Sequence, residues 1–526
     1  MSLTRWALFL LGCMLLASCA DADFFQKDAL VKQPQPAGTD SVWVVAGRHY
    51  DRSAFHRFFW GDHNRDIWTT PVAVPVFNLH TTQVGFKLIE KGGGFQTISF
   101  ELQDKFGRTY ALRSIDKDPV QVLSKFWQPT FVTNIVRDQT SAANPYAALV
   151  VPVLAEAAGV LHTNPRLYYI RSTDQSFGQY AALVQGKLFL LEEKYKSPAD
   201  LQDGLHNVID IEGSEDALRL RFTNPRYHFD QKAFARARLL DLFLGDWDRH
   251  KGQWDWAYIK QDSEVYFKPI PKDRDQAFLK MNDGVIPFIA TSKLLARKLH
   301  SFSKNIDDVK ALMINAAFID ARLLNELTRN DWQQIAKQLQ LALTDAVIEK
   351  SVRLLPAPIY TLIGKEITQS LKNRRKQLPA AADEMYKLLA AEVTIAGTDL
   401  KENFIVKRLP NGNTEVTMLR PATTKLPAKV MYQRVFLPHE TNEIILHGLA
   451  GNDEFSVDGD VQDAILVKIY GGLGEDKITD NSHVAGRKKM TQIYDTERGN
   501  EILFGTEAKD FTTRDVRVHA YDREGN

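Results

Sequence analysis

The feature that most constrains this chain is a pair of acidic clusters, each placed directly after an apolar segment. An apolar run from Leu240 ends in GDWDRH at residues 245–250, and a β-like segment ends in KDRDQAF at residues 272–278. Carboxylates at the ends of apolar elements are expected to project into a cleft, because burying an unpaired carboxylate is costly. This placement favours a site for a metal ion and a nucleotide. The residues alone leave a second interpretation, in which Arg249 and Arg274 are structural partners of the neighbouring acids.

Length and composition limit the number of domains and the class of protein. A chain of 526 residues is too long for one ordinary hydrophobic core, so we expect two or three domains. With 44% apolar and 25% charged residues, the composition is that of a globular protein. The formal net charge of +1 provides no electrostatic basis for binding nucleic acid, so no nucleic acid is expected as a partner.

The N-terminus resembles a bacterial lipoprotein signal peptide. Arg5 precedes a short apolar run over residues 6–17, and the chain then reads Leu-Ala-Ser-Cys up to Cys19, which resembles a lipobox. We therefore expect residues 1–19 to be the signal peptide and lipobox, with a lipid on Cys19 that attaches the protein to a membrane. The alternative is an ordinary signal peptide with a chance cysteine.

The residues around the lipobox also predict where the protein is located. Ala20 stands where an Asp retains many lipoproteins in the inner membrane, so the resemblance implies an outer-membrane lipoprotein of the bacterial envelope, facing the periplasm or the surface. Residues 20–41 carry proline and glycine among polar residues and are expected to form a flexible tether. The only other cysteine is Cys13, inside the part that would be removed, so no internal disulfide is expected.

Residues 42–195 are expected to form an α+β region that contains a glycine-rich turn. A β-meander is predicted over residues 85–118, with Gly92, Gly93 and Gly94 in its first turn and Arg113 on its last strand. Such a turn exposes backbone N–H groups to a phosphate, although an ordinary hairpin has the same composition.

Further acidic and histidine residues lie in the same region. A helix is predicted over residues 129–143, which include Asp138, and an apolar strand over residues 186–194 ends near Glu192. His56 and His63 lie among aromatic residues, but their spacing matches no usual pattern of metal ligands, so packing is the favoured interpretation.

The remainder of the chain divides into a helical and a β-rich part. Residues 196–395 show helical periodicity from Thr291 onwards, for example over residues 292–302, 306–317 and 344–354. Residues 396–526 are predicted to form a β-rich domain.

This C-terminal domain contains a partial repeat. GLAGNDEF from Gly448 parallels GGLGEDKI from Gly471, an offset of 23 residues that is about one rung of a β-solenoid, and the second copy matches a calcium-binding, RTX-like turn. Asp453 and Asp476 would either bind Ca²⁺ between stacked turns or cap those turns.

Taken in chain order, these parts resemble a protein kinase, and most of all the atypical kinases: CotH spore-coat kinases, secretory-pathway casein kinases and HipA. The resemblance implies an α+β fold, with a two-lobed kinase-like domain (β-rich N-lobe, helical C-lobe) and then a small all-β, β-solenoid-like domain. It implies Asp248 as the catalytic base and Asp273, Asp275 and Gln253 as ligands of Mg²⁺ or Mn²⁺ bound with ATP. Its implied nucleotide-binding residues are Gly92, Gly93, Gly94, Arg113, Asp138 and Glu192, with Asp138 as the helix partner of Arg113.

The chain also departs from the kinase pattern. Arg113 stands where Lys is usual, so that a planar fork replaces a point charge, and Gln253 and Asp246 stand where Asn is usual. Two functions therefore stay open. One is an envelope-anchored kinase that phosphorylates a hydroxyl of a protein or glycan, and the other is a non-catalytic, pseudokinase-like binding or scaffold module.

A closer resemblance covers nearly the whole chain. KGGG at residues 91–94, YALRSIDKDP at residues 110–119 and GDWDRH at residues 245–250 are similar to one region of large Bacteroidetes envelope proteins. In those proteins this region lies between a metallophosphoesterase domain and a BamA-like outer-membrane barrel. The resemblance implies an association with outer-membrane assembly and supplies no activity for the region itself.

Overall fold

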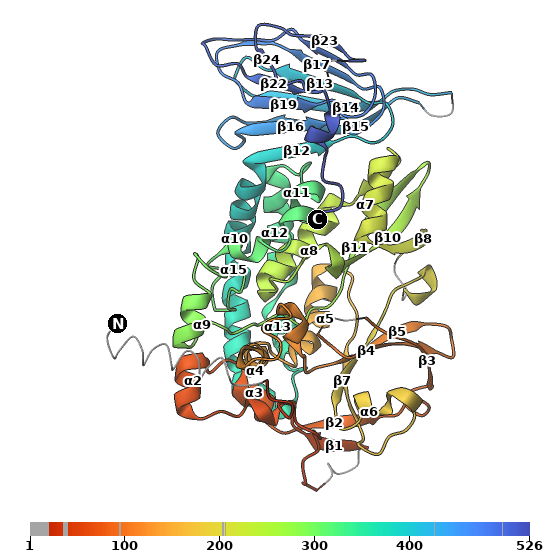
Figure 1. The fold of residues 1–526 in the computed structure, drawn as a ribbon, viewed down its shortest axis with the longest axis vertical. Coiled ribbons are helices and arrows are strands. Elements are labelled where there is room, and N and C mark those ends of the chain that lie inside the picture. The colour runs from red at the N-terminus through yellow and green to blue at the C-terminus, as the bar shows by residue number, and fades with distance from the viewer. Residues whose placement is uncertain are drawn as a thin grey trace.

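The computed structural model describes residues 20–34, 40–93, 96–201, 205, 207–424, 427–496 and 498–525. Cys19 and Gly94, both singled out from the sequence, lie outside these residues. Figure 1 shows three parts along the long axis: a sheet with short helices, a helical middle and a β-domain at the opposite end.

The N-terminal sheet has seven strands in the order β1-β2-β6-β7-β5-β4-β3. β3, β4 and β5 pair antiparallel in sequence, which confirms the predicted meander, and β5 also pairs antiparallel with β7. Alternation of buried and exposed residues sets the register, since a slip by one residue would turn the apolar face of a strand to solvent. The strands are β1 (Ser41–Val44), β2 (Val72–Phe77), β3 (Phe86–Lys91), β4 (Ser99–Asp104), β5 (Thr109–Ser114), β6 (Arg166–Ile170) and β7 (Leu188–Glu193).

Short helices flank this sheet. The helix expected over residues 129–143 is α4 (Phe131–Asp138), capped by the Thr130 hydroxyl, and continues as the 3-10 turn η3 (Gln139–Ala142). α5 ends at Gly159, whose left-handed φ of 66° suits glycine. The helical elements are η1 (Arg48–Tyr50), α2 (Ala54–Trp60), α3 (Arg65–Thr69), η2 (Pro119–Val122), α4, η3, α5 (Ala147–Ala158), η4 (Gly178–Tyr180), α6 (Ala181–Val184) and η5 (Pro198–Asp200).

The middle part combines a helical bundle with a four-stranded sheet in the order β8-β10-β11-β9. Long elements pack around α8, whose Leu and Phe side chains are buried against α12, α15 and β11. The strands are β8 (Val208–Gly213), β9 (Tyr227–Phe229), β10 (Trp254–Gln261) and β11 (Glu264–Pro271). The helices are α7 (Ser214–Thr223), α8 (Gln231–Leu244), η6 (Lys251–Gln253), α9 (Val285–Ala290), α10 (Val309–Met313), α11 (Ala317–Leu323), α12 (Arg329–Ala342), α13 (Asp345–Val352), α14 (Ala357–Ile359), η7 (Tyr360–Gly364) and α15 (Lys365–Ala390).

Two helix predictions in this part are corrected by the structure. Residues 292–302 form turns and not a helix. The nearby helix is α9, which lies just before them. Pro287 fits the first turn of α9, and the helix ends before the Thr-Ser-Lys sequence that follows it. Residues 306–317 contain only the short α10, which begins after its cap Asp308. The predicted helix over 344–354 is confirmed as α13, capped by Thr344. Among the described residues, no helix is long and apolar enough to cross a membrane.

The C-terminal β-domain consists of two large sheets, ordered β12-β16-β19-β22-β24 and β15-β14-β13-β17-β20-β23, and the two-stranded sheet β18-β21, with a separate core. Glu443 pairs with Leu466 and Glu454 with Lys477 in parallel register, so the offset found in the sequence is the spacing of stacked strands. The strands are β12 (Glu392–Ala396), β13 (Asn403–Arg408), β14 (Thr414–Arg420), β15 (Lys429–Phe436), β16 (Glu443–His447), β17 (Glu454–Asp458), β18 (Asp460–Val461), β19 (Leu466–Tyr470), β20 (Lys477–Asp480), β21 (His483–Val484), β22 (Thr491–Tyr494), β23 (Glu501–Leu503) and β24 (Ala508–Asp510), before η8 (Val516–His519).

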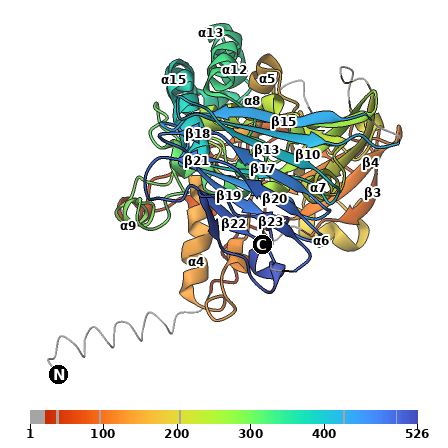
Figure 2. The same cartoon turned by 90° about the horizontal axis from the view of Figure 1, so that it is seen from above.

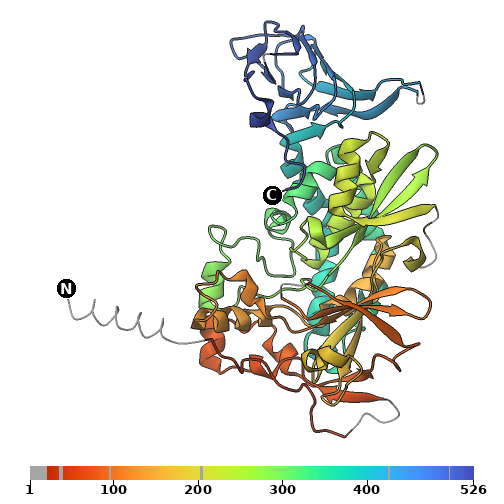
Figure 3. The same cartoon turned by 45° about the vertical axis from the view of Figure 1, so that its right-hand side comes forward.

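The β-domain is joined to the helical part at two places. The long helix α15 leads directly into β12, and the last residues return from the β-domain to the helical part (Figure 3). There Arg523 binds Asp399 and Lys251 contacts the Glu524 carbonyl. Lys251 belongs to η6, so the end of the chain lies beside one of the two acidic clusters.

Candidate functional site

A single hairpin brings the two acidic clusters together. α8 ends at Gly245, which has a left-handed φ of 69°, and the chain then passes through η6 into β10. β10 and β11 pair from Trp254 with Pro271, and the amide of Lys272 donates to the Gln253 carbonyl at 3.0 Å. The hairpin therefore returns the chain to the point where it left α8, so that Asp248 and Asp273 belong to adjacent loops.

Arg113 on β5 forms the contact between the N-terminal sheet and these loops. Its Nη1 lies 3.1 Å from Oε1 of Glu192 and 3.1 Å from Oδ1 of Asp273. Burial opposes ionisation of Asp273, but the charges of Arg113 and Lys117 hold its pKa below the usual value. Burial raises the pKa of Glu192, against the opposing effect of Arg113.

Asp273 also has an unusual backbone conformation. Its φ is 56°, in the left-handed region that non-glycine residues seldom adopt and that Asp tolerates better than most. Strained residues of this kind cluster at functional sites, where the surrounding structure holds them in place. The side-chain amide of Gln253 hydrogen-bonds Asp273, so the structure brings together two of the three predicted metal ligands.

Lys117 binds the third of these residues and was missed by sequence reasoning. Its Nζ forms an ion pair with Asp275, and burial of this carboxylate raises its pKa although Lys117 opposes the effect. Burial opposes ionisation of Lys117, but the charges of Asp275, Asp273 and Asp248 raise its pKa above the usual value. The available signal was a lysine between two aspartates, directly after the strand that carries Arg113.

Asp248 has a partner that the sequence did not reveal. The side-chain amide of Asn315 donates to Oδ1 of Asp248 at 2.7 Å, from the segment between α10 and α11. Asp248 is half-buried, and the contact orients its carboxylate. Nothing in the local sequence around Asn315 distinguishes it, because its role depends on how α10 and α11 pack against the loop.

The expected pairing of Asp138 with Arg113 is wrong. Asp138, at the end of α4, accepts hydrogen bonds from Arg65 at 3.0 and 2.6 Å and from Arg52 at 2.9 Å. These cations compensate for its burial and lower its pKa to about 2. The acidic partner of Arg113 within the sheet is Glu192, because β5 and β7 are neighbours and α4 lies elsewhere.

The histidines near α2 occupy packing positions, as the sequence favoured. His56 contacts Asp138 at 2.9 Å, and the ring of His63 contacts the Ser141 hydroxyl at 3.1 Å. Burial lowers the pKa of His63 to about 3, so this ring is neutral.

The two arginines of the acidic clusters both lie close to a third carboxylate, that of Asp241. Arg274 binds Asp241 on α8 at 2.5 Å, and Arg249 lies 3.4 Å from the same residue. Arg249 is 3.8 Å from Asp246, whose oxygens are buried without a hydrogen-bond partner, and burial raises the pKa of Asp246 to about 7. Structural contacts thus account for the two arginines, but Asp246 is buried without a hydrogen-bond partner, and Asp248, Asp273 and Asp275 are left at the cleft.

The glycine-rich turn lies between β3 and β4. Gly92 donates its amide to the Ser99 carbonyl at 2.8 Å, and Gly93 has open space where a side chain would be. Thr97 from the same turn lines a cavity together with Arg113, Lys117, Glu192, Asp273 and Asp275. The turn is therefore at the site, and the adjacent Gly94 lies outside the described residues.

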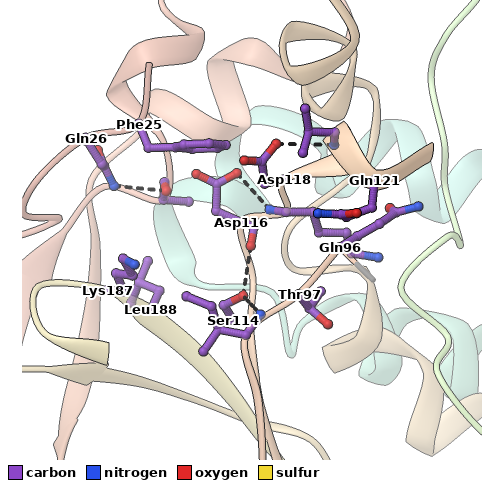
Figure 4. Close-up of a pocket in the computed structure, with 14 residues that line it drawn as sticks. Phe25, Gln26, Gln96, Thr97, Ser114, Asp116, Asp118, Gln121, Lys187 and Leu188 are labelled. Atoms are coloured by element: carbon purple, nitrogen blue, oxygen red, sulfur yellow. Dashed lines mark hydrogen bonds between the residues drawn. The ribbon is translucent and has the colours of Figure 1, made fainter. Parts of the chain in front are cut away.

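Two neighbouring cavities share the residues Thr97, Ser114 and Lys117. The one between the ion pairs has a volume of about 60 Å³, which is too small for a nucleoside triphosphate while the ion pairs are closed. The other has about 380 Å³ and extends past Asp116, Gln96 and Phe25 (Figure 4). A ligand larger than a metal ion would have to separate Lys117 or Arg113 from its carboxylate.

The acidic residues at the cleft are suited to a metal ion only in combination with a ligand. Among the described residues, no group of three or more His, Cys, Asp or Glu side chains is arranged to hold a metal ion. Mg²⁺ commonly takes one or two carboxylates and completes its shell with phosphates and water. Asp273 and Asp275, with the amide of Gln253, provide that kind of incomplete set.

Among the described residues of the C-terminal domain, Asp453 and Asp476 belong to no group arranged to hold a calcium ion. Oδ1 of Asp453 accepts from the Glu402 amide at 2.7 Å, and Oδ1 of Asp476 accepts from the Asp453 amide at 2.8 Å. Both carboxyls are buried, and burial raises the pKa of Asp453 to about 9 and that of Asp476 to about 6. These are the contacts expected for the alternative interpretation, in which the two residues cap stacked turns.

Comparison with known proteins identifies resemblances of fold only. No protein-family model and no curated protein matches the chain. The *Helicobacter pylori* proinflammatory kinase CtkA is 12% identical over 60% of this chain and 99% of its own, with a TM-score of 0.30. HipA of *Shewanella oneidensis* is 12% identical over 60% and 76%, with a TM-score of 0.26. The Golgi casein kinase is 11% identical over 66% and 84%, with a TM-score of 0.27.

These matched structures have kinase-like folds. A second structure of the Golgi casein kinase, with Mn/ADP bound, covers 63% of this chain at a TM-score of 0.26. All of the TM-scores are below 0.5, so no residue role in this chain follows from the matches.

Proposed function

We propose that this protein binds a complex of a divalent metal ion and a nucleotide between β5, β7 and the loops after α8 and β11, and transfers a phosphoryl group to a hydroxyl. The observation that supports the proposal is the contact of Arg113 with Asp273. Arg113, a cation on the sheet, contacts Asp273, whose backbone has a left-handed conformation. Gln253 interacts with the same aspartate. The kinase-like folds of the matched structures agree with this proposal at the level of fold class.

The charges at the cleft are suited to exchange partners with a nucleotide. Without a ligand, Arg113 and Lys117 neutralise Asp273 and Asp275. A triphosphate would attract the two cations, and a divalent cation would take over the two carboxylates. Because each charged group keeps an oppositely charged partner, binding would avoid leaving a buried charge unpaired.

A metal ion bound by Asp273, Asp275 and Gln253 would neutralise charge on the transferring phosphate. Asp248 is the proposed base. Its Oδ1 accepts from Asn315, so Oδ2 is the atom that would accept the proton of the substrate hydroxyl. Gly93 would offer its backbone amide to the phosphates, since the amide of Gly92 is bound to the Ser99 carbonyl.

The location and substrate are part of the proposal. The lipobox motif supports an outer-membrane lipoprotein attached through Cys19, with a protein or glycan of the envelope as the substrate. The likeness to a region of Bacteroidetes envelope proteins supports an association with outer-membrane assembly.

A non-catalytic function is the second candidate. The small cavity between closed ion pairs favours it, as does the guanidinium in place of an ammonium group on β5. In that case the cleft would bind a nucleotide or polyanion without transferring phosphate.

Thermal unfolding with and without Mg²⁺ and ATP tests the binding site. We expect ligand to raise the Tm of the wild type and of Asp248→Asn, and to leave Asp273→Asn unchanged. Asp262→Asn is the matched control, because Asp262 is an exposed, left-handed residue at the far turn of the same hairpin. Unchanged stabilisation of Asp273→Asn would show that the metal assignment is wrong.

Phosphate transfer separates the two candidates. If the wild type transfers ³²P from ATP to envelope extract and Asp248→Asn binds ATP without transfer, the protein is a kinase. Binding with no transfer by the wild type would favour the non-catalytic function.

A further inference from the structure

Large apolar side chains are exposed together on α2, α9 and the neighbouring loops. The set, called the apolar face below, comprises Phe55 and Phe58 on α2, Phe126 before α4, Phe288 on α9, and Leu294 and Leu295 after it. Phe55 is 76% exposed, Phe126 70%, Phe288 67% and Leu294 93%. Soluble monomers seldom expose contiguous apolar patches of this size without a partner.

The elements that carry the apolar face are held against one another. Oδ2 of Asp283, just before α9, accepts from the His63 amide after α2 at 2.7 Å. His56 on α2 contacts Asp138 at the end of α4. Figure 1 places α2, α4 and α9 on the same side of the molecule, and Figure 2 shows α4 and α9 at its periphery.

Residues 20–30 belong to the segment expected as a flexible tether, but they are packed against the domain, so the beginning of the described chain is fixed on this side. The Ala20 amide donates to the Pro129 carbonyl at 2.9 Å, and the Asp21 amide donates to Asn134 at 2.8 Å. Arg137 on α4 donates to the Asp21 carbonyl at 2.9 Å. Consecutive Cα atoms are about 3.8 Å apart, so a lipid on residue 19 would enter a membrane next to Phe126.

The charged residues in the α9 segment of the apolar face are basic, whereas the exposed acids Asp51, Asp62 and Asp66 near α2 are bound by Arg57. No Asp or Glu lies between Gly284 and Ile306, whereas this segment contains Lys293, Arg297, Lys298 and Lys304. Arg297 forms a hydrogen-bonded ion pair with Asp308, whereas Lys293 and Lys298 are exposed. Exposed apolar side chains interspersed with lysines are typical of surfaces that lie at the interface of an anionic bilayer.

We propose that the apolar face docks on a lipid bilayer and inserts Phe126 and Phe288 among the headgroups. The proposal rests on the lipid attachment at Cys19 given under the proposed function, and not on the kinase-like site. It goes beyond attachment, because docking would fix the orientation of the domain on the membrane. A second copy of the chain or a protein partner on the same face is the competing outcome of the test.

Single labels on a membrane-attached chain test this docking. The sequence contains cysteine only at positions 13 and 19, so a chain starting at Ala20 is free of cysteine and keeps every described residue. A hexahistidine tag before Ala20 attaches it to phosphatidylethanolamine–phosphatidylglycerol vesicles that contain a nickel-chelating lipid. Phe126→Cys, Phe288→Cys and the control Leu341→Cys each carry an environment-sensitive dye; Leu341 is 78% exposed on α12.

We expect the dyes at positions 126 and 288 to shift their emission to shorter wavelength and to be quenched by nitroxide lipids, and the dye at position 341 to remain in water. Without the tag, Phe126→Ser combined with Phe288→Ser should reduce vesicle binding by about tenfold or more, and Leu341→Ser should not.

Equal water exposure at all three positions would overturn the docking proposal, as would equal insertion at all three. A shift that requires a high protein concentration and no vesicles would assign the face to a second copy instead. In this test the tag, and not a lipid, attaches the chain to the vesicles. Absence of a lipid on Cys19 in cells would therefore contradict only the proposed lipid anchor. Absence of ATP binding would contradict only the proposed nucleotide site.

Discussion

Lys117 and Asp275 form an ion pair between the end of β5 and the loop after β11, although they are 158 residues apart in the chain. Together with the contact of Arg113 and Asp273, this pair closes the cleft between the sheet and the helical part. Each cation is positioned where a nucleotide phosphate would compete with an aspartate for it.

Two substitutions of Arg113 should separate the effect of its charge on Mg–ATP binding from the effect of its planar shape. Arg113→Met removes the cation between Glu192 and Asp273, so we expect no measurable binding of Mg–ATP by calorimetry. Arg113→Lys keeps the charge as a single ammonium group and should retain binding within about tenfold. Arg108→Met, in the turn between β4 and β5, is the control and should bind as the wild type. Equal binding by Arg113→Met would remove Arg113 from the site.

Asn315 should act by positioning Asp248. Asn315→Ala removes the hydrogen bond to Oδ1 of Asp248, so the carboxylate loses a fixed orientation. We expect kcat for phosphate transfer to fall about tenfold or more, with little change in KM for ATP. Asn315→Asp is informative as well, because a second carboxylate would repel Asp248. A parallel change in KM and in thermal stability would indicate a structural role instead.

The buried ion pairs of α8 should be essential for stability. Arg238 donates to Asp320 at 2.8 and 3.0 Å and to Asp241 at 2.8 Å, and its side chain is fully buried. Arg238→Met leaves buried carboxylates without this partner, so the free energy of unfolding should fall by about 3–5 kcal/mol. Urea unfolding measures the change. Arg236→Met, on the same helix and partly exposed, should cost less than about 1 kcal/mol.

The C-terminal β-domain should become less stable as the pH rises. Burial raises the pKa of Asp453 to about 9, whereas an aspartate in the unfolded chain titrates at about 3.9. Between these values the unfolded chain binds fewer protons than the folded one, so the free energy of unfolding decreases with increasing pH. We expect the Tm of the domain to be lower at pH 9 than at pH 6 by roughly 5 °C or more.

Asp453→Asn provides the comparison for this prediction. The amide keeps an oxygen for the Glu402 N–H and cannot ionise, so the variant should lose most of the decrease in Tm. Asp458→Asn changes an exposed carboxylate at the end of β17 and should behave as the wild type. An identical pH dependence in Asp453→Asn and the wild type would show that other groups cause it.

Much of the local structure was predictable from sequence. The meander over residues 85–118, the helix that ends at Gly159 and the 23-residue offset between stacked strands all depend on neighbouring residues, whose periodicity and turn composition are visible in the chain. The helix expected over 292–302 failed because its apolar residues do not share one buried face. Leu294 and Leu295 remain exposed, whereas Phe302 packs against the core, so helical periodicity there had no continuous buried face to stabilise.

The site was predictable only in part. The residue types and the order of Arg113, Asp248, Gln253 and Asp273 were apparent, since acids at the ends of apolar elements indicate a cleft. Their partners were not. Glu192 replaces Asp138 beside Arg113 because β5 and β7 are adjacent strands, and strand order is a property of the whole sheet.

The sequence by itself determined most of the strands and helices and which carboxylates end them, because these depend on residues a few positions apart. Only the tertiary structure decided which charges meet. Lys117 reaches Asp275, Asn315 reaches Asp248, and Arg274 turns away from its own cluster to Asp241. An ion pair or hydrogen bond forms over a few ångströms in space, and packing of the core, not distance along the chain, sets that separation.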